Sequence, residues 1–423
     1  MREALSMVDS RALEALIDGA LQAVPSLDDA LDPMPLHKVP GLGVGVSIGS
    51  VKAPGRSTPD VVVLATERPA AFAAVTTTST AAAAPCHWTR ARVPGLRRAV
   101  VVNSGNANAA TGARGVRDTE VMASAVAAEL GCSPADVLVC STGVIGVPLP
   151  MSRLLPAIST AAQDALQAAE PELSASLAIC TTDTREKSAG GQFGAVTVAG
   201  IAKGSGMIHP NMATMLGFLA TDATVEARHL QELLESVNAH TFSQISVDGD
   251  MSTNDTVVLM STGQGPRLGP GLPGWEDLVT GVALVARQLA RDIARDGEGA
   301  RTLISVTVDG GDTHAEARAW ARAVVSSSLF KAAVHGRDPN WGRIVGALGA
   351  GGAQGLDNLD IDLGDVPVMR EGAPIPFDEA RASAAMSAAE LAVHIGLPGT
   401  GRGVAWGCDL SAQYVAINAD YRS

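Results

Sequence analysis

Six strand-like apolar runs, interleaved with amphipathic helical segments, constrain the fold of this chain more than any other feature. The runs lie at residues 60–66, 97–103, 136–142, 193–202, 255–262 and 302–310. Between them, residues 118–130 predict a helix, and two further helices are predicted by apolar stripes at a spacing of three and four residues. These stripes comprise Leu230, Leu233, Leu234 and Val237, and Leu278, Val282, Val285, Leu289 and Ile293. Because the strands and helices follow no strict strand–helix–strand rhythm, the pattern indicates a layered α/β or α+β fold.

The composition limits how the core can be built. Apolar residues make up 46% of the 423 residues, but aromatic residues only 3%, so Ala, Val, Leu and Ile must fill the core. This length predicts roughly two or three domains. The last third, from about residue 312, has the pattern of a smaller domain.

Charge and cysteine content exclude several classes of function. The net charge is −13 and the chain has no run rich in Lys or Arg, which argues against nucleic acid or an anionic membrane as partner. The five cysteines are scattered and form no CxxC, so we expect neither a disulfide scaffold nor a zinc site, but a reducing, cytoplasmic location. No apolar run approaches the roughly 18 residues that a membrane span needs.

The N-terminal region reads as a helix followed by a linker. Ser10 could cap a helix with its apolar face at Leu13, Leu16, Ile17, Leu21 and Val24, and residues 25–40 are rich in proline. The acidic residues Glu3, Asp9, Glu14 and Asp18 argue against a signal or transit peptide.

Three glycine-rich stretches fail as nucleotide-binding loops. "KGSG" at 203–206 carries its lysine before the glycines, which is the wrong order for a phosphate-binding loop. "GLGVG" at 41–45 and "GALGAGG" at 346–352 lack the strand-to-helix setting and the downstream acid, so we expect turns there.

The run "KGSGMIHPNMATML" at 203–216 is too broken for a helix and too rich in glycine for a strand. A threonine becomes a useful nucleophile when a base lies within reach, and cutting the peptide bond before it frees its own amine, with a pKa of about 7.7–8.0, for that task. The small Ala213 before Thr214 suits such a cut. On these residues alone, a buried methionine-rich connector is the favoured alternative.

The motifs along the chain resemble the ornithine acetyltransferase family, the bifunctional glutamate N-acetyltransferases. The resemblance rests on the run above, followed by "TDA", and extends in the family's order from about residue 39 to the end. The other matching motifs are "VVNSGNANAATG" at 101–112, "STGVIGVPLPM" at 141–151, "TTDT" at 181–184, "VDGDMSTNDT" at 247–256, "RDGEGA" at 295–300, "DPNWGRI" at 338–344 and the terminal "INADYRS".

The resemblance implies an αββα-type sandwich and a division of the chain into three parts. These parts are an N-terminal extension at 1–38, a catalytic domain at 39–311 and a smaller α+β domain at 312–423. It also implies that the chain cleaves itself between Ala213 and Thr214, and that the two products form an α2β2 heterotetramer.

The same resemblance assigns the chemistry. Thr214 takes the acetyl group of N-acetylornithine and passes it to glutamate, in ping-pong order. Thr142 and Gly143 form the oxyanion hole, where a glycine after a strand lets the backbone come close; read alone, "STGVIG" is a strand-end turn. The implied substrate contacts are Thr181, Lys203, Thr214, Glu298, Asn418 and the terminal Ser423. Without the resemblance, Lys203 would read as a surface lysine and Glu298 as a loop acid after a helix.

Some features remain open at this point. His209, Asn106 and Asn108 are interpreted as structural rather than catalytic. We expect no metal and no bound cofactor, with acetyl-CoA as a candidate second donor. "EGART" at 298–302, the stretch 86–95 and the terminal serine depart from the family pattern and leave the acyl acceptor and the pathway open. The alternatives are an acetyltransferase of specialised metabolism, a self-cleaving aminopeptidase or amidase (against which a threonine at position 214 counts), and a non-catalytic interaction protein.

Overall fold

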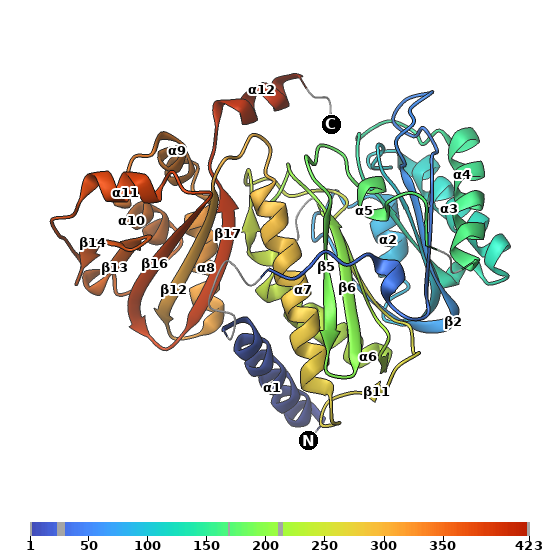
Figure 1. Cartoon of the computed structure of the whole chain (residues 1–423), viewed down its shortest axis with the longest axis horizontal. Helices are drawn as coiled ribbons and strands as arrows, with labels where there is room; N and C mark the ends of the chain where they lie inside the picture. Colours follow the sequence, from blue (N-terminus) through green and yellow to red (C-terminus); the bar gives the residue numbers. More distant parts are fainter. Residues whose placement is uncertain (1, 23–29, 168–169, 210–214, 421–423) are drawn as a thin grey trace.

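The first sheet of the molecule is built around one long strand, β2. The computed structural model describes residues 2–22, 30–167, 170–209 and 215–420 (Figure 1). In this part of the chain the first sheet has eight strands in the order β4-β3-β2-β10-β7-β6-β5, and β1 pairs with β2. Its strands are β1 (Leu42–Ser47), β2 (Val61–Thr76), β3 (Gly95–Asn103), β4 (Val137–Ser141), β5 (Lys187–Phe193), β6 (Val196–Lys203), β7 (Leu216–Thr221) and β10 (Thr256–Ser261).

Strand β2 joins two layers of this sheet. Its first half, from Val61, pairs with β1 and β3, and its second half, up to Thr76, pairs with β10. The pairing with β3 shifts between Ala65 and Ala70, where the strand crosses from one layer to the other. One apolar core fills the space between the layers, with Leu64 from the first layer and Phe218 from the second both fully buried in it.

Helices cover both outer faces. Residues of β2 alternate, so that Val62 faces the central core and Val63 faces helices α3 and α4. On the other layer, Leu219 and Leu259 face α6 and α7. The order helix, sheet, sheet, helix confirms the predicted αββα sandwich. The helices in this part are α2 (Ala84–Arg90), α3 (Gly112–Leu130), α4 (Met151–Leu166), α5 (Ala175–Ala178), α6 (Ala227–His240) and α7 (Trp275–Arg295), with short 3₁₀ turns at Leu36–Lys38, Pro134–Asp136 and Phe242–Gln244.

The prediction of turns at the glycine-rich stretches 41–45 and 346–352 is wrong. The first stretch forms strand β1, and a Cβ at Gly43 or Gly45 would lie 2.0 Å from Ala165 O or 1.8 Å from Ala161 O of α4. These glycines therefore let a helix pack directly on a strand. Residues 346–350 lie in helix α10, because tertiary packing overrides the low helix propensity of glycine.

A second sheet follows in the order β15-β14-β13-β16-β12-β17-β9 and has its own apolar core. Strand β12 lies in this sheet although it precedes residue 312, where we expected the smaller domain to begin, and β9 comes from the first part of the chain. The strands are β9 (Ile245–Ser246), β12 (Leu303–Gly311), β13 (Asp360–Leu363), β14 (Val366–Arg370), β15 (Ala373–Pro374), β16 (Glu390–Gly399) and β17 (Arg402–Cys408). The helices are α8 (His314–Ser326), α9 (Ser328–Gly336), α10 (Trp341–Ala350), α11 (Glu379–Ala385) and α12 (Ala412–Asp420), with a 3₁₀ turn at Leu356–Asn358; β8 (Thr224–Val225) and β11 (Arg267–Leu268) form a separate pair.

The N-terminal helix α1 (Arg2–Gln22) packs along α7 and also contacts α6 (Figure 1). Its Ile17 is fully buried in the same core as those helices. Ser10 lies inside α1, so the expected cap at this residue is wrong. Val24 lies outside the described residues.

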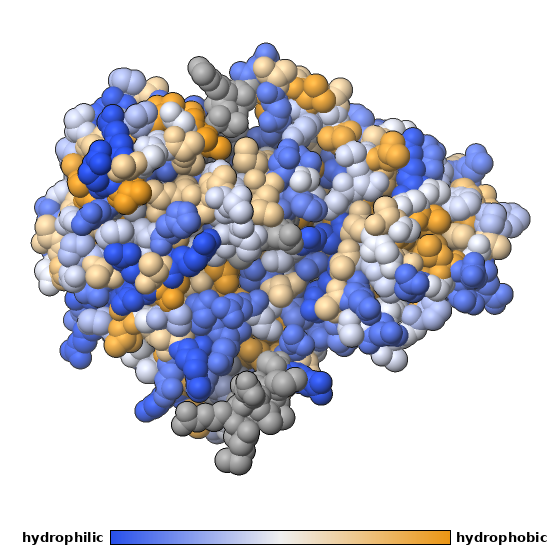
Figure 2. Space-filling model, turned by 180° about the vertical axis from the view of Figure 1, so that it is seen from behind, coloured by the Kyte–Doolittle hydropathy of each residue, from blue (hydrophilic) through white to orange (hydrophobic). Residues whose placement is uncertain are grey.

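The outer surface is mixed in character. Figure 2 shows hydrophilic and hydrophobic residues interspersed over the face seen from behind. Among the described residues, no helix has both the length and the apolar character needed to cross a membrane.

Candidate active site

Six predicted site residues that are far apart in the sequence line one cavity of about 70 Å³. They come from the end of β4, the loop before β5, the end of β6, the loop after α7, and α12. Fold topology, not sequence proximity, therefore builds the site. The residues are Thr142, Gly143, Thr181, Lys203, Glu298 and Asn418.

Three predicted residues fall outside the described part of the chain. These are Ala213 and Thr214, on either side of the predicted cleavage, and the terminal Ser423. Their predicted roles therefore stay predictions.

Thr142 and Gly143 follow β4 directly. The Thr142 amide donates to Asn103 O at 3.0 Å, so its hydroxyl is the group left to face the cavity. That hydroxyl accepts a hydrogen bond from Lys203 Nζ at 3.4 Å. Gly143 has a φ of 131°, and a Cβ there would lie 2.3 Å from the carbonyl carbon of Gly105. Only glycine fits at this position, because a side chain would clash and the backbone conformation is left-handed.

A set of buried asparagines braces this turn. Asn106 Nδ2 donates to Val147 O at 3.0 Å, and Asn254 Nδ2 donates to Ser141 O at 2.9 Å. Asn108 Nδ2 donates to Gly115 O at 2.9 Å, which ties the loop to α3. These contacts agree with the structural role predicted for Asn106 and Asn108.

A buried ionic network lies beneath the cavity. The Asp183 carboxylate accepts hydrogen bonds from the amides of Thr181 at 3.0 Å and Gly204 at 2.6 Å. It also pairs with Lys187 Nζ at 2.7 Å, and Lys187 pairs with Asp296 at 2.6 Å. Burial alone would raise the pKa of Asp183, but the nearby charges of Lys203 and Lys187 outweigh it and lower that pKa to about 2. The network therefore fixes the backbone on both sides of the cavity with a permanent negative charge.

Glu298 and Asn418 meet at one wall of the cavity. Asn418 Nδ2 donates to Glu298 Oε2 at 2.8 Å, and Glu298 is only 8% exposed. The Glu298 amide also donates to Ser205 O at 2.8 Å. A Cβ on Gly206 would lie 2.5 Å from the Glu298 carboxylate carbon, so the glycine makes room for the carboxylate. This wall offers a buried negative charge to a cationic group.

His209 is not among the residues that line the cavity. Its Nδ1 lies 3.2 Å from Ser246 Oγ and 3.3 Å from Ser326 Oγ, so the ring connects β9 with α8. Burial and, to a lesser degree, the charge of Arg322 lower its pKa. These contacts agree with the predicted structural role.

Comparison with known proteins decides the family. A sequence model of the ArgJ family matches residues 45–423. The arginine biosynthesis bifunctional protein ArgJ of Symbiobacterium thermophilum is 47% identical over 88% of this chain and 94% of its own length. The ArgJ protein of Thermus thermophilus is 46% identical over 90% of this chain and 98% of its own length.

The chain belongs to the ArgJ family. Among solved structures, the ArgJ protein of Bacillus halodurans is 41% identical and covers 47% of this chain and 96% of its own, with a TM-score of 0.46. The family match begins after α1, and the predicted extension at 1–38 stays a prediction.

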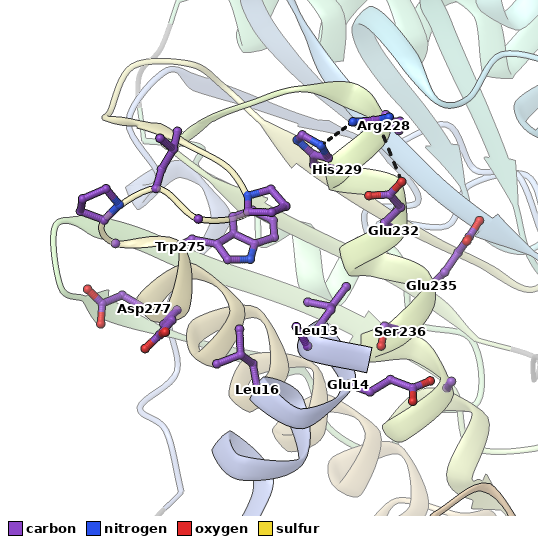
Figure 3. Close-up of a pocket in the computed structure, with 18 residues that line it drawn as sticks. Leu13, Glu14, Leu16, Arg228, His229, Glu232, Glu235, Ser236, Trp275 and Asp277 are labelled. Atoms are coloured by element: carbon purple, nitrogen blue, oxygen red, sulfur yellow. Dashed lines mark hydrogen bonds and ion pairs between the residues drawn. The ribbon is translucent and has the colours of Figure 1, made fainter. Parts of the chain in front are cut away.

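A much larger cavity, of about 1360 Å³, lies away from these residues (Figure 3). It is bounded by α1, α6 and the start of α7, and Figure 3 shows Arg228 bonded to His229 and paired with Glu232 at its edge. None of the six described candidate residues lines it. In this ArgJ family member, the predicted donors and charges thus meet at the smaller cavity.

The ionic network next to this site was not predicted from the sequence motifs. Asp183 lies in the quoted "TTDT" motif, and Lys187 follows it by four residues, which was an available signal for a pair. Asp296 is more than one hundred positions away, at the end of α7, and only the fold brings it to Lys187. No cluster of three or more His, Cys, Asp or Glu residues suited to a metal ion occurs in the described ranges.

Proposed function

We propose that this protein transfers an acetyl group from N-acetylornithine to glutamate in arginine biosynthesis, through an acetyl ester on Thr214. Membership of the ArgJ family supports the reaction, and the single observation that carries it here is the cavity lined by Thr142, Gly143, Lys203 and Glu298. An oxyanion site with one buried cation and one buried anion suits an amino-acid substrate with an acyl group.

Maturation precedes transfer. The Thr214 hydroxyl attacks the Ala213 carbonyl carbon, the peptide C–N bond breaks, and the chain continues through an ester. Water then hydrolyses this ester, which leaves a carboxylate on Ala213 and a free amine on Thr214. That amine, with an ordinary pKa of about 7.7–8.0, is the base for the transfer reaction.

In the transfer, the free amine takes the proton of the Thr214 hydroxyl as its oxygen attacks the acetyl carbon. The acetyl C–N bond breaks, ornithine leaves with that proton, and the acetyl ester remains. The amine of glutamate then attacks the ester carbon and the C–O bond breaks. The proton of the attacking amine passes through the Thr214 amine to the Thr214 oxygen, and N-acetylglutamate leaves. Lys203 would pair with the substrate carboxylate, and Glu298 with the ammonium group of ornithine. The Thr142 hydroxyl and the Gly143 amide would stabilise the tetrahedral oxyanion that forms in each of the two steps.

Three finer points belong to the same proposal. Acetyl-CoA is a second acetyl donor, and no bound cofactor takes part. The two cleaved chains assemble as an α2β2 heterotetramer. The enzyme works in the cytoplasm, which its five free cysteines support.

One assay tests the proposal and separates it from peptide hydrolysis on the same scaffold. Purified enzyme receives glutamate with either N-acetylornithine or acetyl-CoA, and, separately, a set of aminoacyl amides. We expect N-acetylglutamate from N-acetylornithine with ping-pong kinetics, and little hydrolysis of the amides. Hydrolysis of the amides without acetyl transfer would instead assign the chain to an aminopeptidase activity.

A further inference from the structure

One loop contacts the chain on both sides of the predicted cleavage. The segment 210–214 lies outside the described residues, but its flanks at Met207–His209 and at Met215 are described. Residues 247–255 connect β9 to β10 and reach both flanks. The mechanism above assigns no task to this loop.

Asp248 holds the upstream flank. Its Oδ2 accepts a hydrogen bond from the Met207 amide at 2.5 Å and its Oδ1 accepts one from the Ile208 amide at 2.8 Å. The adjacent Val247 amide donates to Ile208 O at 2.7 Å. Met207 has a φ of 57°, a left-handed conformation that is unfavourable for a residue with a side chain. A carboxylate that binds two successive amides offsets this strain and fixes where the segment begins.

Asp255 holds the downstream flank. Its Oδ1 accepts a hydrogen bond from the Met215 amide at 3.0 Å, and the Thr256 amide donates to Met215 O at 3.1 Å. This amide is the N–H group of the peptide bond between Thr214 and Met215. Asp255 is fully buried. Burial raises its pKa well above the usual value for aspartate, against the opposing effects of the Met215 hydrogen bond and the charge of Lys203.

We propose that Asp248 and Asp255 are positioning residues for self-cleavage, and that they hold the two flanks of the segment that contains the Ala213–Thr214 bond. The inference rests on the self-cleavage proposed above. Because both aspartates lie on one short loop, between β9 of the second sheet and β10 of the first, the distance between the flanks is set by that loop. Intramolecular attack by a hydroxyl on the preceding carbonyl requires such a fixed geometry, and a misplacement of about 1 Å can cost about 10²-fold in rate.

After cleavage, Asp255 and Asp248 contact different product chains. Asp255 remains bonded to the residue that follows the nucleophile, so it continues to position Thr214 during acetyl transfer. Asp248 is bonded to the other product chain, and the Tyr414 hydroxyl donates to its Oδ2 at 3.2 Å. Tyr414 lies on α12, which also carries Asn418, so Asp248 connects the upstream flank to the substrate wall.

The test follows cleavage of the full chain after cell-free synthesis with a labelled amino acid, by gel electrophoresis over time. Asp255→Ala and Asp248→Ala remove the acceptor, whereas Asp255→Asn and Asp248→Asn keep an oxygen acceptor without the charge. We expect each alanine variant to cleave about 10- to 100-fold more slowly than wild type. Asp255→Asn should recover most of the rate, because only one oxygen of Asp255 accepts a hydrogen bond from the flank. Asp248→Asn should recover only part of it, because both oxygens of Asp248 accept and asparagine keeps one acceptor. Processed Asp255→Ala should show a lower kcat with little change in KM.

Asp222→Ala is the matched control. Asp222 is also buried and accepts a backbone hydrogen bond, from the Thr197 amide at 2.8 Å. It follows the end of β7 that is far from Met215. A thermal unfolding transition identifies variants that fold. Folded Asp255→Ala that cleaves at the wild-type rate, or equal slowing in Asp222→Ala, would overturn the inference. If Asp255→Ala does not fold, the cleavage rate of Asp248→Ala decides instead, because Asp248 is only half-buried; a wild-type rate would overturn the inference. A wild-type chain that stays intact would instead refute the proposed self-cleavage itself.

Discussion

Glu298 lies against the backbone of residue 206 because that residue is glycine, and Asn418 holds its carboxylate from the other side. The wall thus presents one buried negative charge in a fixed place. An ion pair between such a charge and a desolvated ammonium contributes more than an exposed pair, because little water screens it.

For this reason we predict that Glu298→Gln lowers kcat/KM for N-acetylornithine by one or more orders of magnitude. Self-cleavage should continue, since it involves only the chain itself. Initial-rate kinetics on fully processed protein measure the effect. Wild-type kcat/KM with each donor and acceptor tested would remove Glu298 from substrate binding.

Asp183 provides the pH prediction at the residue scale. Its pKa is about 2 in the folded protein and near 3.8 in the unfolded chain, so the carboxylate stabilises the fold above about pH 4. That contribution, about 2 kcal/mol, disappears as the pH falls from about 4 to about 2. Urea unfolding of wild type should therefore lose this amount over that range, in excess of the loss seen for Asp183→Asn. Parallel curves for the two proteins would contradict the assignment.

At the scale of elements, the N-terminal helix α1 is an integral part of the larger core. Ile17 is fully buried among residues of α6 and α7, whereas Arg11 on the same helix is exposed. This helix precedes the residues that match the family model, and it adds its own buried side chains to the core.

We predict that Ile17→Ala destabilises the protein by about 2–5 kcal/mol, because it leaves a cavity in a packed core. Arg11→Ala should change stability by less than about 0.5 kcal/mol. Chemical denaturation measures both. Because α1 does not line the candidate cavity, kcat of folded Ile17→Ala should match wild type; an unchanged stability would show that α1 does not dock in solution.

Periodicity predicted the long elements well and the short glycine-rich ones badly. Helices α6 and α7 follow from their apolar stripes, since a stripe of that spacing must face a core. Strand β1 could not be predicted in the same way. Glycine is required in this strand because α4 packs directly on its backbone, and α4 lies more than one hundred residues away in the sequence. The cap expected at Ser10 failed because the helix starts earlier.

At the scale of the whole molecule, the site forms where the sandwich meets the C-terminal helix. Figure 1 shows α12 above the junction between the two sheets, and Asn418 from that helix completes the cavity. The position of Thr142, Lys203 and Glu298 in one cavity followed from the family resemblance, not from any local pattern. The aspartates beneath and beside the site could not be predicted, because their partners are backbone amides that only the fold brings close.

The most direct test of the account is the intact mass of the purified protein before and after addition of N-acetylornithine. We predict two chains, residues 1–213 and 214–423, and one acetyl group that appears on the second chain with the donor and leaves it when glutamate is added. Thr214→Ala should give one full-length chain that never gains an acetyl group. An active wild-type protein that remains a single uncut chain, or a processed protein that transfers acetyl groups without acetylation of the second chain, would contradict the account.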